Sequence, residues 1–263
     1  MKAQIGIRLT EKTIIIGGPF SGLTRSLATT LTEAGADVVM IAQDVDHARR
    51  FAENLSDARE VHPEYGRAAA MAANLCDPKQ AHETVSRVAE LFGTIEGYVD
   101  LHASPPGKPL NDPHALSALD EVIDTCLRPT LIMAHATLKF LEGRKKGRLI
   151  FILQDALRLG FPEEAVGAAC RTGLQAFCLS LAREVMDQNI TVNCVTTGFS
   201  EDYYLSRHPG SASQSATEEK LRHNIKHLRT TSITDVANMV AYLLSPLSQS
   251  LTGQTISVNQ GLT

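Results

Sequence analysis

Short apolar runs alternate with longer stretches of helical spacing along most of the chain. Near the N-terminus, an apolar run over 14–16 leads into a loop marked by Gly17, Gly18 and Gly22, then into helical spacing over 26–33 and a second apolar run over 38–42. Apolar residues three or four apart are typical of a helix packed on one side, whereas a short continuous run is typical of a buried strand. The pattern predicts strand, glycine loop, helix and strand, the unit that opens a dinucleotide-binding fold.

The same alternation continues to the C-terminus. Helices are predicted over 45–55, 78–92, 116–142, 165–188 and 235–244, and strands over 68–73, 95–101, 149–153, 191–195 and 254–258. Asp77 should cap the helix that starts at Pro78, and Pro129 should break or shift the long helix around it. Seven strands with six intervening helices predict an α/β fold with a single Rossmann-type, doubly wound, parallel seven-stranded sheet and helices on both faces, in one domain over 1–263.

One stretch departs from this alternation. Residues 199–232 are polar and poorly periodic, with a short charged helix predicted over 218–228, and we expect them to form a mobile lid. Tyr203 and Tyr204 lie in this segment, as do three histidines without the carboxylate pattern of a metal site, so no metal is predicted.

Composition narrows the classes of partner. Charged residues make up 21% of the 263 residues and the net charge is −4, so nothing indicates a nucleic-acid surface or a disordered chain. No apolar run approaches the roughly 20 residues of a membrane span, and the first residues lack the apolar core of a signal peptide. We therefore expect no membrane association and a cytoplasmic location. The five cysteines have no paired spacing and are expected to be buried hydrophobes.

Several segments together resemble the short-chain dehydrogenase/reductase family, which includes ketoreductases of acyl carriers and hydroxyacyl-CoA dehydrogenases. The resemblance covers nearly the whole chain, and its matching segments are IIIGGPFSGLTRSLA, LFGTIEGYVDLHA, DEVIDTCLRPT, GRLIFILQ, RTGLQAFCLSLAREV, ITVNCVTTGF and DVANMVAYLLSPLSQSLTGQTISVNQG. It implies the doubly wound fold and a nicotinamide-dependent oxidoreductase. Because one fold hosts many functions, each site position has to be examined separately.

The resemblance also implies a catalytic set of Tyr, Lys, Ser and Asn, and all four positions have changed. They carry Gly167, Arg171, Gln154 and Cys126 here, with Leu153 at the Ser position if the register slips by one. Glycine has no proton to give, so acid/base help typically worth about 10²- to 10⁴-fold would be lost at that position. Arg171 keeps a positive charge and Gln154 could donate to a carbonyl, but ordinary packing or ion pairing is the simpler interpretation of both. We therefore predict vestigial catalytic positions and a chain that is not an enzyme on its own.

The cofactor positions implied by the resemblance have changed in parallel. Of the loop glycines, Gly18 and Gly22 remain and the third is Thr24, with Pro19 and Phe20 crowding the loop. A tight turn without a ligand is the simpler interpretation of this loop. Asp44 lies two positions beyond the place of the acidic residue that usually contacts the ribose, and could substitute for it. The other changed positions are Asn74, Asp100-Leu101-His102-Ala103 and Thr197-Gly198. We expect no cofactor in this chain.

His102 allows two interpretations, a replacement acid/base or a ring that fills a vacated pocket, and the second is the simpler.

The stretches that correspond to the family's subunit contacts remain apolar, which suggests that this chain is a supporting subunit. In the family, the long helix before the fifth strand, the helix after it, and the last strand and helix contact other subunits, and these stretches stay apolar here. We predict a partner chain, a catalytic short-chain dehydrogenase paralogue carrying NAD, in a hydroxyacyl-CoA dehydrogenase with two chains of each kind. The candidate contacts are Leu174, Phe177, Cys178 and Leu181, opposite Leu131, His135 and Leu138. The alternatives are an active reductase with relocated acid/base residues and a regulatory homo-oligomer that binds a ligand.

Overall fold

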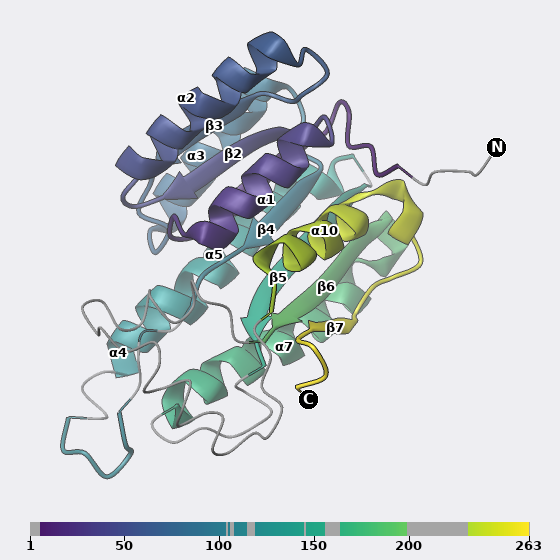
Figure 1. Cartoon of the computed structure of the whole chain (residues 1–263). Coiled ribbons are helices and arrows are strands. Elements are labelled where there is room, and N and C mark those ends of the chain that lie inside the picture. The colour runs from purple at the N-terminus through teal and green to yellow at the C-terminus, as the bar shows by residue number, and fades with distance from the viewer. Residues whose placement is uncertain are drawn as a thin grey trace.

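Seven parallel strands form one twisted sheet in the order β3-β2-β1-β4-β5-β6-β7 (Figure 1). The computed structural model describes residues 6–103, 105, 108–114, 119–144, 146–155, 164–198 and 231–262. The strands are β1 Thr13–Gly17, β2 Asp37–Ala42, β3 Ala68–Ala72, β4 Gly97–Asp100, β5 Gly147–Gln154, β6 Ile190–Thr197 and β7 Thr255–Val258. The predicted fold class, a doubly wound parallel sheet, is confirmed. The predicted lid and its tyrosines lie outside the described residues, apart from positions 231 and 232.

Helices cover both faces of the sheet (Figure 1). One face carries α1 Gly22–Glu33, α2 Asp46–Val61 and α10 Ile233–Leu244, and the other carries α3 Pro78–Phe92, α5 Arg128–Glu142 and α7 Ala165–Glu184. The pleat divides β1 between the two cores, because successive side chains of a strand point to opposite faces. Ile14 and Ile16 belong to the core under α1 and α10, whereas Ile15 belongs to the core under α3, α5 and α7.

The strand order places a crevice at the carboxyl edge of the sheet. From β1 the chain builds outward through β2 to β3, and then returns to add β4 on the opposite side of β1. The connections after β1 and β4 therefore leave in opposite directions, and ligands of such sheets bind in the crevice that this reversal opens.

The long helix expected over 116–142 is interrupted, as the sequence indicated. It consists of α4 Leu119–Val122, a π-helical turn η1 over Ile123–Leu127, and α5. The irregular turn precedes Pro129 rather than centring on it, because Pro129 takes a place in the first turn of α5, where a missing N–H costs nothing. The π-turn contains Cys126, whose side chain is completely buried.

The apolar stripe of α7 mainly faces the sheet. Leu174, Cys178 and Leu181 are buried in the core, Phe177 is half-buried, and Leu179 is exposed. By length and composition alone α7 could cross a membrane, but its buried residues give it the position of a core helix. A helical period alone cannot divide an inner face from an outer one, and the structure assigns these three candidate contact residues to the inner face.

Candidate functional site

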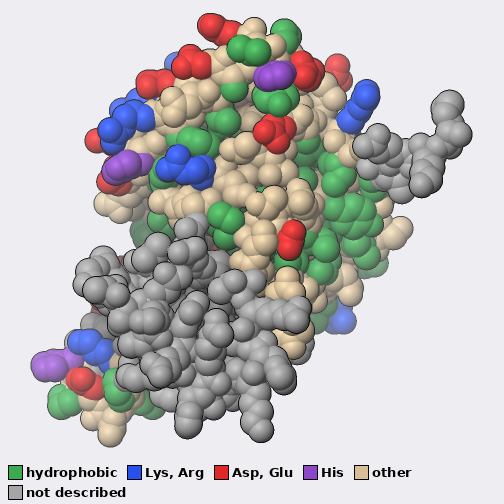
Figure 2. Space-filling model, viewed as in Figure 1, with side chains coloured by type: hydrophobic (Ala, Val, Ile, Leu, Met, Phe, Trp, Pro, Cys, Tyr) green, Lys and Arg blue, Asp and Glu red, His purple; other side chains and the backbone are tan. Residues whose placement is uncertain are grey.

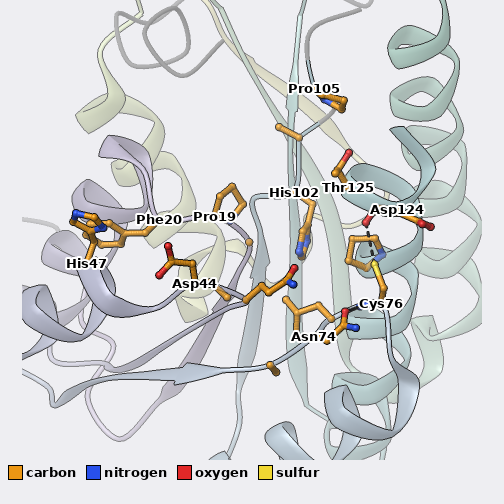
Figure 3. Close-up of a pocket in the computed structure, with 17 residues that line it drawn as sticks. Pro19, Phe20, Asp44, His47, Asn74, Cys76, His102, Pro105, Asp124 and Thr125 are labelled. Carbon is orange, nitrogen blue, oxygen red and sulfur yellow. Dashed lines mark hydrogen bonds between the residues drawn. The ribbon is translucent and has the colours of Figure 1, made fainter. Parts of the chain in front are cut away.

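A pocket of about 470 Å³ lies at the carboxyl ends of β1 to β4 (Figure 3). Its volume is within the 300–1,000 Å³ common for small-molecule sites. Its walls come from the loop after β1, the ends of β2 and β3, the residues after β4, and the start of η1 and α5. Figure 3 shows His102 projecting into it between Asp44 on one side and Cys76 and Asp124 on the other.

The loop after β1 is fixed by close contacts and a helix cap. Gly18 has φ +127°, and a Cβ there would come within 2.9 Å of the Leu101 carbonyl carbon, so the position requires glycine. Ser21 caps α1 by accepting the N–H of Thr24 at 3.2 Å, and the Thr24 hydroxyl accepts the N–H of Ser21 at 3.1 Å. Thr24 therefore completes a capping box in place of the third family glycine.

The two residues expected to crowd this loop, Pro19 and Phe20, both line the pocket. The ring of Phe20 packs against Phe51 with centroids 5.7 Å apart, and the guanidinium of Arg25 lies 5.2 Å from the Phe20 ring centroid. Phe20 therefore forms one wall of the pocket through a cluster with α1 and α2, and its ring is held by that cluster. Pro19 lines the pocket and its carbonyl accepts the Thr24 hydroxyl at 2.8 Å.

A buried carboxylate organises the end of β4. Asp100 is completely buried, and its Oδ1 accepts the hydroxyl of Tyr98 at 2.5 Å and lies 2.8 Å from Nδ1 of His102. Its Oδ2 accepts the backbone N–H of His102 at 3.3 Å and lies 2.9 Å from the hydroxyl of Thr130 on α5. A buried charge is stable only where donors surround it, and this carboxylate has four contacts of that kind.

Tyr98 lies beneath this carboxylate and is fully buried. Burial, together with the neighbouring Asp100 charge, raises the pKa of Tyr98 well above its ordinary value. The residue therefore stays a phenol and donates its hydrogen bond across the whole range in which proteins are usually handled.

The four vestigial catalytic positions lie elsewhere, and none of them lines the pocket among the described residues. Gly167 and Arg171 are buried in the first turns of α7, and Arg171 pairs with Glu164 at 2.7 Å. Gln154 ends β5, and its buried Oε1 has no hydrogen-bond partner among the described residues. Cys126 is enclosed in η1. The packing and ion-pair interpretation fits Arg171 and Cys126, while Gln154 presents an unsatisfied acceptor.

Five of the positions that the resemblance assigns to the cofactor do line the pocket: Gly18, Asp44, Asn74, His102 and Ala103. Gly22 and Thr24 begin α1 next to it. Asp44 lies after β2 with Oδ1 accepting the N–H of Asp46 at 3.2 Å. After β3, the side-chain oxygen of Asn74 accepts the N–H of Cys76 at 3.0 Å. Thr197 and Gly198, by contrast, follow β6 and do not line the pocket.

Sequence reasoning missed the partners of His102. A signal was present, because Asp100 and His102 are two positions apart at the end of a buried strand and so share one face. An aspartate within the apolar segment GYVD also needs a reason to be buried. Thr130 could not be found in this way, since 30 residues separate it from Asp100.

Comparisons with known proteins agree with this fold over the whole chain. A family model described as enoyl-(acyl carrier protein) reductase matches residues 18–263. The 2,3-dihydroxy-2,3-dihydro-p-cumate dehydrogenase of Pseudomonas putida is 28% identical over 259 residues, which cover 98% of this chain and 90% of that protein. The 3-oxoacyl-[acyl-carrier-protein] reductase of Aquifex aeolicus is 25% identical over 259 residues, covering 97% of this chain and 99% of the reductase.

Solved structures show the same fold. A short-chain dehydrogenase from Burkholderia cenocepacia, determined in complex with NADP, aligns with a TM-score of 0.81 and 24% identity over 97% of this chain and 99% of its own. A gluconate 5-dehydrogenase from the same organism, in complex with NADP and tartrate, aligns with a TM-score of 0.86 and 20% identity over 98% and 97% of the two chains. At this level of identity the structures support the fold alone.

These comparisons correct one prediction. The similar proteins are dehydrogenases and reductases, so the prediction that this chain is not an enzyme on its own is wrong. The error came from giving the four changed side chains more weight than a replacement acid/base such as His102, whereas catalytic groups can lie at other positions of the same edge of the sheet.

Proposed function

The chain belongs to the short-chain dehydrogenase/reductase family, in the group whose model is described as enoyl-(acyl carrier protein) reductase, and we propose that it is an oxidoreductase that interconverts a hydroxyl and a carbonyl group with a nicotinamide cofactor. The observation that carries the proposal is the pocket of about 470 Å³ at the reversal of strand order, lined by Gly18, Asp44 and Asn74. When bound, the nicotinamide would accept a hydride from the substrate carbon that bears the hydroxyl, or donate one to the carbonyl carbon.

The residues present fit a dinucleotide. The first N–H groups of a helix have no partner inside it, and the capping box uses those of Ser21 and Thr24. The N–H groups of Gly22 and Leu23 remain between them and are suited to a phosphate. The Asp44 carboxylate after β2 is suited to the ribose hydroxyls, and Phe20 is held by Phe51 and Arg25 as a wall of the pocket. The earlier expectation of no cofactor in this chain stays a prediction, and a titration decides between the two.

The cofactor proposal predicts a preference for NADH over NADPH. A carboxylate at Asp44 accepts ribose hydroxyls and repels a 2′-phosphate. Asp44→Asn should weaken NADH binding about 10- to 100-fold, since a hydrogen bond to a charged group contributes roughly 1.5–3 kcal/mol, and should leave NADPH binding unchanged or stronger. Isothermal titration calorimetry with each cofactor measures both effects.

The matched control is Asp187→Asn, which removes an equally exposed carboxylate near the start of β6, at the opposite edge of the sheet. It should leave both affinities unchanged. Wild-type protein that binds neither cofactor at millimolar concentration would contradict the proposal and favour a cofactor held only by a partner chain.

A narrower form of the proposal concerns the substrate and the assembly. The changed catalytic positions within an intact frame resemble one subunit of the two-subunit dehydrogenase that oxidises 2-[hydroxy(phenyl)methyl]succinyl-CoA in anaerobic toluene breakdown. In this form, the chain works beside a second family member and the substrate is an acyl-CoA alcohol. Turnover of that thioester by the co-expressed pair, without turnover of simple alcohols, is the result that supports it.

A further inference from the structure

We propose that His102 is the proton-transferring residue of this site and that Asp100 is its positioning residue, held in turn by Tyr98 and Thr130. The inference rests on the proposed oxidoreductase function and names the group that replaces the missing tyrosine of the family. It begins from the one titratable pair of the described structure that is both buried and turned toward the pocket, His102 with Asp100.

The first step is that the carboxylate has a fixed orientation. Its two oxygens face different elements, since Oδ1 contacts Tyr98 of β4 while Oδ2 contacts Thr130 of α5. The backbone N–H of His102, which can only donate, also points to Oδ2. The Thr130 hydroxyl shares its proton between Oδ2 and the Cys126 carbonyl, 2.7 Å away. Rotation of the carboxylate would break contacts on both sides, so Asp100 presents Oδ1 to the imidazole ring.

The second step is that this orientation selects a tautomer of His102. Oδ1 accepts from Nδ1 at 2.8 Å, which places the proton of the neutral ring on Nδ1. Nε2 is then the basic nitrogen, and it has no hydrogen-bond partner among the described residues. Only 9% of His102 is exposed, and the ring lines the pocket, so its free nitrogen is available to a ligand there rather than to bulk water.

The titratable groups next to His102 are not placed to transfer a proton in the pocket. Tyr98 is sealed under the loop, because even a Cβ at Gly17 would come within 2.7 Å of its hydroxyl oxygen. Cys76 donates its thiol proton to the Asp124 carbonyl at 3.0 Å, and burial raises its pKa. The other ionisable groups around the pocket, Asp44, His47 and Asp124, are exposed side chains. Within the part of the chain that the structure describes, His102 is the one titratable group that combines access to the pocket with an orienting carboxylate.

The resulting chemistry is balanced. Oxidation of an alcohol to a ketone releases one hydride and one proton: Nε2 of His102 takes the proton from the hydroxyl, and a bound nicotinamide would accept the hydride with both electrons. The imidazolium that forms faces the Asp100 carboxylate, which stabilises it. In the reverse direction the same Nε2–H donates to the carbonyl oxygen.

The test combines a spectroscopic and a kinetic measurement. In cofactor-free protein labelled with ¹⁵N at histidine, the His102 ring should show the Nδ1–H tautomer at neutral pH, and Asp100→Asn should remove this preference. With NADH or NAD and the substrate pair acetoacetyl-CoA and 3-hydroxybutyryl-CoA, His102→Gln should lower turnover about 10²- to 10⁴-fold while leaving NADH affinity within about threefold.

The matched control is His82→Gln, on the exposed side of α3, which should change neither turnover nor the spectrum of His102. An Nε2–H tautomer in the wild-type protein overturns the inference whether or not the cofactor binds. So does turnover that His102→Gln leaves intact, and in that case the oxidoreductase proposal stands. Wild-type protein without cofactor binding and turnover contradicts the oxidoreductase proposal instead.

Discussion

Gly17 and Tyr98 depend on each other at the scale of single residues. Tyr98 is a large, fully buried side chain, and its ring and hydroxyl fill the space that a side chain at position 17 would need. The hydroxyl in that space reaches Asp100, so the glycine of β1 makes the hydrogen-bond network of β4 possible. A residue outside the pocket thereby determines how a pocket residue is held.

Gly17→Ala should therefore destabilise the protein. The new Cβ would lie 2.7 Å from the Tyr98 hydroxyl and 2.8 Å from a ring carbon, and overpacking of this kind typically costs about 1–3 kcal/mol. Urea denaturation measures the change in the free energy of unfolding. Gly173→Ala is the matched control, because nothing lies near its Cβ position within α7 and the change should stabilise by roughly 0.5–1 kcal/mol. Equal effects of the two changes would contradict the packing argument.

Helix α3 shows how an element is fixed by its end. Asp77 accepts the N–H of Lys79 at 2.9 Å and that of Gln80 at 3.4 Å, and Pro78 occupies the first turn. These hydrogen bonds, led by the one from Lys79, lower the pKa of Asp77 below its ordinary value of 3.8. The charged carboxylate therefore caps the helix more strongly than the protonated acid does.

Asp77→Ala should destabilise the protein in a pH-dependent way. Because the folded-state pKa is lowered, the stability from the charged cap is fully present above the ordinary pKa and is lost as the pH falls through the folded value. The difference in unfolding free energy between wild type and variant should stay constant from pH 7 to about pH 5 and shrink below roughly pH 4. A difference that is constant down to pH 2 would show that the carboxylate charge has no part in the cap.

The elements themselves could be predicted from the sequence, and α3 was predicted with its bounds and its cap. The reason is that hydrophobic period, N-caps and glycine loops are local properties of the chain. At Ile123–Leu127 the sequence predicted an interruption of the helix near Pro129 but not a π-turn. One extra residue in a helix changes the spacing of apolar residues too little to be recognised.

The site was less predictable than the elements. The positions Gly18, Asn74 and His102 were identified, but the network that gives His102 a role was not. Its members come from β4 and α5, and only the folded chain brings the Thr130 hydroxyl to the Asp100 carboxylate. The sequence showed that the family's four catalytic side chains are replaced. It did not show that Asp100 and His102 form a hydrogen-bonded pair, because that depends on the folded geometry.

At the scale of the whole molecule, apolar side chains remain at one edge of the sheet. Figure 2 shows hydrophobic side chains gathered over α10 and the segment that follows it. Met239, Tyr242 and Leu251 are partly buried there, and Leu247 is 52% exposed. The adjacent β7 is an edge strand, whose outer backbone groups are available for pairing. Together these features define the C-terminal surface, and surfaces of this type commonly serve as contacts between protein chains.

The C-terminal surface should therefore form a contact between chains. Native mass spectrometry of the protein co-expressed with its predicted paralogue should find two chains of each kind, whereas the chain alone should form a homo-oligomer or be poorly soluble. Leu247→Ser should weaken the assembly, since it removes the most exposed of these apolar side chains from the C-terminal surface. Val61→Ser is the matched control, because Val61 is 75% exposed at the end of α2, away from this surface. A stable monomer with and without the paralogue would contradict the predicted assembly, and it would leave the pocket and His102 to be explained within one chain.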